Sequence, residues 1–72
     1  MARNFYEIIG LLQEGISQEV PASDYSEFQL EQMVDEAVRG KTILYIRDSY
    51  LLTESQIRRL TADGKKRNVV FR

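Results

Sequence analysis

The sequence contains neither cysteine nor histidine, and these absences exclude several kinds of stabilising or catalytic site. Without cysteine there is no disulfide, and without either residue the ordinary zinc and haem sites are ruled out. Carboxylates and hydroxyls remain as ligands for a hard cation, but no acidic run has the spacing of a calcium-binding loop. We therefore expect no metal and no cofactor.

Long apolar runs are also lacking. No stretch approaches the roughly 20 apolar residues that a membrane-spanning helix needs. The N-terminal residues 1–4 also lack the apolar region of an export signal. We expect a cytoplasmic protein that does not contact a membrane.

The sequence has no recognisable catalytic motif. Its four glycines never cluster into a phosphate-binding loop, and no G-x-S-x-G segment is present. Gly40-Lys41-Thr42 imitates the tail of a Walker motif, but it lacks the upstream glycine and precedes a predicted strand instead of following one. Asp48-Ser49 follows that strand, at the edge where open α/β sheets bind ligands, although a turn is the favoured interpretation. We predict that the protein is not an enzyme.

The first helix is predicted over residues 4–14. Four apolar residues recur at the helical period, and Asn4 is a suitable N-cap. The apolar residues are Phe5, Ile8, Ile9 and Leu12. Gly10 interrupts this helix, either because another helix approaches closely there or because a weak helix former is tolerated.

Two further helices are predicted from a short block that occurs twice, in residues 25–33 and 52–60. Each block has the capping-box pattern of a hydroxyl residue followed three positions later by glutamine, and an apolar pair suited to a hydrophobic staple. The capping residues are Ser26 with Gln29 and Thr53 with Gln56. In the helix that starts at the first block and ends at Gly40, the acidic residues are predicted to face water, and they are Glu27, Glu31, Asp35 and Glu36.

Two strands are predicted, over residues 42–47 and 68–71, each after one of these helices. A strand, a helix and a second strand within about 30 residues have the size of a βαβ crossover, so the strands should run parallel. The expected fold is a single α/β (or α+β) domain over residues 1–72, in the order α-α-β-α-β with helices packed on two parallel strands. Its parts are the helix 1–15, a connector 16–24 pinned by Ile16 and Val20, and helix–strand units at 25–47 and 52–71. The similarity of the two units reflects either duplication or the general form of a capped helix.

The net charge of −1 hides a marked asymmetry along the chain. Residues 1–36 carry eight acids and one base, whereas residues 37–72 carry nine bases and three acids. The two halves either neutralise each other in the folded protein, or the basic half binds an anionic partner such as nucleic acid. The candidate basic patch is Arg58, Arg59, Lys65, Lys66, Arg67 and Arg72.

Self-association is the functional prediction that we favour, with a different protein as another partner and nucleic-acid binding as the alternative. A chain this short has a small core, and without disulfides or a metal the remaining way to stabilise it is association. The strand at 42–47 is apolar on both faces, which is typical of a strand covered on both sides. We predict a small interaction or accessory module that forms a homodimer. The predicted interface residues are Ile43, Tyr45, Val69 and Phe71.

Overall fold

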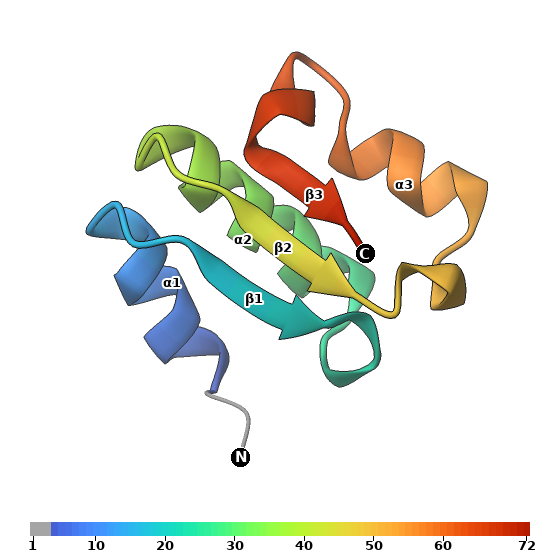
Figure 1. The fold of residues 1–72 in the computed structure, drawn as a ribbon, viewed down its shortest axis with the longest axis horizontal. Coiled ribbons are helices and arrows are strands. Elements are labelled where there is room, and N and C mark those ends of the chain that lie inside the picture. The colour runs from blue at the N-terminus through green and yellow to red at the C-terminus, as the bar shows by residue number, and fades with distance from the viewer. Residues whose placement is uncertain (1–3) are drawn as a thin grey trace.

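A computed structural model describes residues 4–72 and has three helices and three strands in strict alternation (Figure 1). Residues 1–3 of the predicted first helix lie outside the described range. The helices are α1 (Phe5–Gln13), α2 (Glu27–Arg39) and α3 (Glu54–Leu60), and the strands are β1 (Gln18–Pro21), β2 (Leu44–Arg47) and β3 (Val69–Phe71). Three short 3-10 turns join them, namely η1 (Ala22–Asp24), η2 (Ser49–Leu51) and η3 (Lys65–Asn68).

The strands form one parallel sheet in the order β1-β2-β3. Gln18, Leu44 and Val69 lie side by side in one row across the sheet, and the next row is Glu19, Tyr45 and Val70. The α/β class and the parallel pairing predicted from the sequence are therefore confirmed. The described residues form three helix–strand units, and the prediction recognised two.

The missed strand is β1, which the sequence analysis treated as a connector. Its residues include two polar side chains and a proline, and proline is tolerated because β1 lies at an edge of the sheet. Val20 is fully buried, as expected of an anchor, but Ile16 is 49% exposed and the prediction for it was wrong. Strand β1 exists because its backbone pairs with β2, a contact between residues about 26 positions apart.

Each helix begins at the predicted N-cap residue. The side chains of Asn4, Ser26 and Thr53 accept a hydrogen bond from the backbone N–H three residues later. In α2 and α3 the glutamine side chain also accepts from the N-cap N–H, which completes both capping boxes. These bonds satisfy donors that a helix start otherwise leaves unpaired.

Removal of the α3 cap should have a measurable cost. Thr53 Oγ1 accepts from the Gln56 N–H at 3.2 Å, so we expect Thr53→Ala to lower the free energy of unfolding by about 1 kcal/mol. The midpoint of urea unfolding should fall accordingly. Ser55→Ala on the same short helix is the control, because Ser55 is exposed and has no capping role, so its midpoint should not fall. Equal midpoints for the two variants would show that Thr53 does not stabilise the helix.

All three helices pack toward one face of the sheet, where the core lies. Figure 1 shows the sheet in front, with α2 behind it, α1 beside β1 and α3 beside β3. Val20, Leu44, Ile46 and Val69 point toward the helices and are buried. The turn η1 contributes Ala22, and the three helices contribute the rest of the core, which is Ile8, Leu12, Leu30, Met33, Val34, Ala37 and Leu60.

The ends of α1 and α2 approach each other closely. Glu36 of α2 is only 7% exposed; its carboxylate accepts from Gln13 of α1 and from Arg39. The prediction that Glu36 faces water was therefore wrong. Its spacing along the helix resembles that of a surface acid, but α1 packs over this position and supplies the polar partner that a buried carboxylate requires.

Candidate interaction surfaces

The sheet face opposite the helices is open. Within residues 4–72 no helix crosses it, as Figure 1 shows from the front. The row Glu19, Tyr45 and Val70 lies on this face, because the residues on either side of each of them in its strand point toward the core. Tyr45 is half-buried and Val70 is 38% exposed. The face is thus apolar in the middle and charged beside it.

Arg72 extends over the centre of this open sheet face. Its guanidinium carbon lies 4.2 Å from the centroid of the Tyr45 ring, and its Nη1 lies 3.4 Å from Glu19 Oε1. The Arg72 backbone is fixed as well, because its N–H donates to Ile46 and its carbonyl accepts from the Ser49 N–H, both at 2.9 Å. A cation over a tyrosine ring is attracted by the negative face of the ring.

Two of the four predicted interface residues lie on the open face and two do not. Ile43 and Tyr45 are half-buried on the open side. Val69 belongs to the core and Phe71 packs against it, so these two side chains lie on the face of the sheet that the helices cover. The apolar residue that β3 presents on the open face is Val70. All three residues of β3 are apolar, so no alternation of apolar and polar residues predicts which of its faces points toward the core.

The predicted basic patch does not form one continuous cationic surface. Four of its six residues contact carboxylates, and these pairs are Arg58–Glu54, Arg59–Glu27, Lys65–Asp35 and Arg72–Glu19. Arg72 follows β3 and pairs with Glu19 of β1, whereas Arg58 belongs to α3. Lys66 and Arg67 are exposed in η3. Three of the four pairs join the basic half of the chain to the acidic half, so the halves neutralise each other within the fold.

Among the basic residues of these four pairs, Lys65 has the least exposed side chain. Lys65 Nζ lies 2.5 Å from Asp35 Oδ1, and its side chain is 28% exposed. The hydrogen bond to Asp35 raises the pKa of Lys65 above its ordinary value, with a smaller opposing effect of burial. The pair connects η3 to α2 and thereby holds the segment before β3 against the helix.

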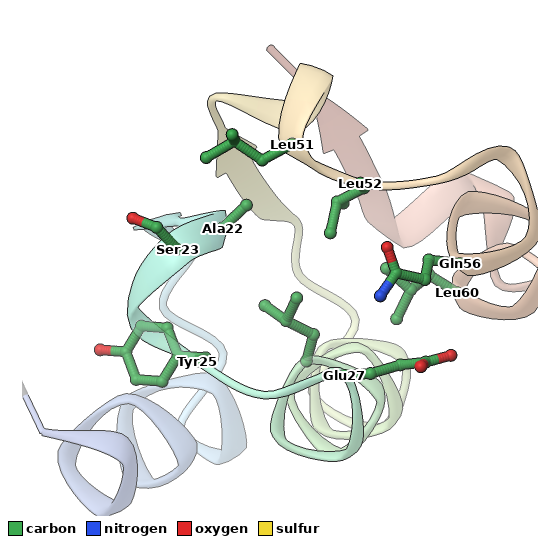
Figure 2. A pocket seen from close by; sticks show the side chains of 9 residues that line it. Ala22, Ser23, Tyr25, Glu27, Leu51, Leu52, Gln56 and Leu60 are labelled. Atoms are coloured by element: carbon green, nitrogen blue, oxygen red, sulfur yellow. The ribbon is translucent and has the colours of Figure 1, made fainter.

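A half-open cavity of about 320 Å³ lies beyond the carboxyl ends of β1 and β2, between η1 and η2 (Figure 2). Apolar side chains form much of its wall, and they are Ala22, Leu30, Leu51, Leu52 and Leu60. The polar lining residues are Ser23, Tyr25, Glu27 and Gln56. Asp48 and Ser49, considered above as residues at this edge of the sheet, do not line the cavity. Asp48 instead takes a left-handed turn conformation with φ 57°, as the turn interpretation requires.

The Tyr25 hydroxyl points away from the cavity (Figure 2). Burial raises the pKa of the Tyr25 hydroxyl, and the negative charges of Asp24 and Glu7 raise it further. Glu27 Oε1 accepts from Arg59 Nη1 at 2.5 Å, and the Glu27 side chain is 31% exposed. Arg59 itself is not among the described residues that line the cavity.

The described residues 4–72 contain no helix long and apolar enough to cross a membrane. Nor do they contain a group of three or more acidic, histidine or cysteine side chains arranged to hold a metal ion. Comparison with known proteins found no matching family model, no similar curated protein and no similar solved structure.

Proposed function

We propose that this chain is a small non-enzymatic interaction module that forms a homodimer through the open face of its sheet. The observation that carries the proposal is an all-parallel sheet with its helices on one face only. Parallel sheets occur almost exclusively with both faces covered. A second copy supplies the missing cover.

Charge complementarity favours a copy of the same chain as the partner. If two sheets face each other across a two-fold axis parallel to β2, β1 of one copy lies over β3 of the other. Glu19 is on β1 and Arg72 directly follows β3, so the ion pair that they form within one chain lies opposite the same pair of the partner, with each acid toward the partner's base. Tyr45 on β2 lies at the axis, so its ring and the Arg72 guanidinium stacked on it meet their counterparts and become buried.

Sedimentation equilibrium at tens of micromolar tests this proposal. We expect a mass near twice the 8.4 kDa of one chain, decreasing on dilution. Tyr45→Asp should weaken the dimer at least about 100-fold, because two carboxylates would replace the aromatic rings at the axis of a desolvated interface. Circular dichroism should show that this variant remains folded, since Tyr45 points away from the core.

Tyr50→Asp is the matched control. Tyr50 is 82% exposed in η2, beyond the end of β2, so the same substitution there should leave dimerisation unchanged. A wild-type mass of 8.4 kDa at every concentration would refute the dimer. Equal weakening by both tyrosine variants would show that the effect of Tyr45→Asp is a general effect of charge and not of the open face.

A further inference from the structure

The cavity beyond the carboxyl ends of β1 and β2 has a largely apolar inner surface. Its walls come from η1, α2, η2 and α3 (Figure 2). Figure 2 shows that the polar ends of Ser23, Tyr25 and Glu27 point away from the cavity. The inner side is therefore formed mainly by aliphatic side chains, of which Leu30 and Leu60 are each only 1% exposed. A surface of this kind favours an apolar occupant over water.

One polar group does face the cavity, and it is the side-chain amide of Gln56. In Figure 2 this amide lies on the cavity side of α3, close to Leu60. The capping box of α3 fixes its orientation, because Gln56 Oε1 accepts from the Thr53 N–H at 2.8 Å. Among the described residues 4–72, no atom accepts a hydrogen bond from Gln56 Nε2. The cavity thus presents a hydrogen-bond donor on an otherwise apolar surface.

We propose that this cavity binds a small neutral molecule with an apolar body and a carbonyl oxygen, that is, an aryl or alkyl ketone. The body packs among Leu30, Leu52 and Leu60, and the carbonyl oxygen accepts a hydrogen bond from Gln56 Nε2. A volume of about 320 Å³ is at the small end of the range for ligand pockets, which suits a body of one ring or a short alkyl chain. The carboxyl end of the strands is also where open α/β sheets bind ligands.

The same surface disfavours a charged ligand of either sign. Glu27 is the single charged residue among the described lining residues, and its carboxylate is paired with Arg59 and points away from the cavity. An ammonium group would lose its water without gaining an acceptor, and a carboxylate would gain only the Gln56 donor. Burial of a charge without a compensating partner costs far more than burial of a neutral carbonyl group.

Titration followed by ¹H–¹⁵N correlation NMR, with three probes that share one aromatic ring, tests the proposal. Acetophenone should shift the backbone amides of the lining residues, with a dissociation constant on the order of 1 mM for a ligand of this size. Benzoate and benzylammonium carry a negative and a positive charge on a similar body, and neither should produce saturating shifts at the same concentrations. Binding of either charged probe as tight as that of acetophenone would overturn the assignment of a neutral ligand.

Two capping-box glutamines provide a matched pair of variants. Glutamate also serves at this position of a capping box, so Gln56→Glu keeps the acceptor for the Thr53 N–H. It replaces the Nε2 donor by a carboxylate oxygen that repels the ketone oxygen, so acetophenone binding should weaken at least about tenfold. Gln29→Glu makes the same change in the capping box of α2, and Gln29 does not line the cavity, so the affinity should be unchanged. Equal affinities for the two variants would overturn the role of Gln56.

A fourth probe tests whether the ligand is a free molecule. N-acetylphenylalanine methylamide presents a ring and carbonyl groups on a peptide, so tighter binding of this compound than of acetophenone would overturn the free ketone and indicate a partner's side chain. Absence of saturating shifts at the lining residues with acetophenone would refute the site. That result would not affect the proposed dimer, because none of the described lining residues belongs to the row of Glu19, Tyr45 and Val70 on the open sheet face.

Discussion

Gly40→Ala should strongly destabilise this protein, whereas Gly10→Ala should increase its stability. A Cβ atom at Gly40 would lie 2.1 Å from the carbonyl oxygen of Leu12 and 3.3 Å from that of Glu36. Both are backbone atoms, so no side chain can rotate away. The ends of α1 and α2 would have to separate, although Leu12 is fully buried between them.

We expect this separation to cost about 3 kcal/mol, at the upper end of the usual range for overpacking. A domain of 72 residues has a total stability of roughly 4–11 kcal/mol. The midpoint of urea unfolding should therefore fall sharply, and a fraction of the variant should be unfolded without denaturant if the wild type is near the lower limit.

Gly10→Ala is the control for this effect. No heavy atom lies within 4 Å of a Cβ built at Gly10, which is in the middle of α1. Alanine is the better helix former, so we expect a gain of about 0.5–1 kcal/mol and a higher urea midpoint. If Gly40→Ala raised the urea midpoint as Gly10→Ala does, the predicted clash between an alanine Cβ at position 40 and the Leu12 carbonyl would be wrong.

Leu44→Ala should have a similarly large effect through the core. Leu44 is fully buried in the central strand, between Gln18 and Val69 in the register of the sheet. Truncation to alanine leaves a cavity between the sheet and the helices, and the surrounding side chains fill it only in part. Substitutions of this kind lower the free energy of unfolding by about 2–5 kcal/mol. The loss should be visible both in the urea midpoint and in the thermal unfolding temperature.

Leu51→Ala is the matched truncation at the surface. Leu51 is 52% exposed in η2, so its removal should cost less than about 1 kcal/mol. A Leu44→Ala variant as stable as the Leu51→Ala variant would show that Leu44 does not occupy the core as the sheet register places it.

The fold brings acidic residues of the N-terminal half into contact with basic residues of the C-terminal half. Arg59, Lys65 and Arg72, from the basic half, contact Glu27, Asp35 and Glu19, from the acidic half. Exposed ion pairs contribute little to stability individually, with a median of about 0–1 kcal/mol. Their larger effect is to cancel the positive field that binding to nucleic acid would require. The sequence left neutralisation and anion binding open, and the contacts favour neutralisation within one subunit.

Gly10 and Gly40 show which structural roles of a glycine the neighbouring residues in the sequence do not predict. From the sequence, a close approach by another helix was one interpretation of Gly10, and no such approach was predicted at Gly40. The structure shows open space around Gly10 and a backbone contact at Gly40. A close approach depends on a segment distant in the chain, in this case Leu12, so neither glycine could be assigned from its neighbours.

The sequence by itself determined the starts of the helices, the α/β class and the parallel direction of the strands. Capping bonds such as that from the Gln56 N–H to Thr53 span three residues, and the short βαβ connection restricts the strand direction. Tertiary structure decided the existence of β1, the burial of Glu36 and the inward side of β3. Each of these depends on a partner far along the chain: β2 pairs with β1, Gln13 bonds to Glu36, and the helices cover Val69. The cavity depends on such contacts as well, because its walls come from turns and helices that only the folded sheet brings together.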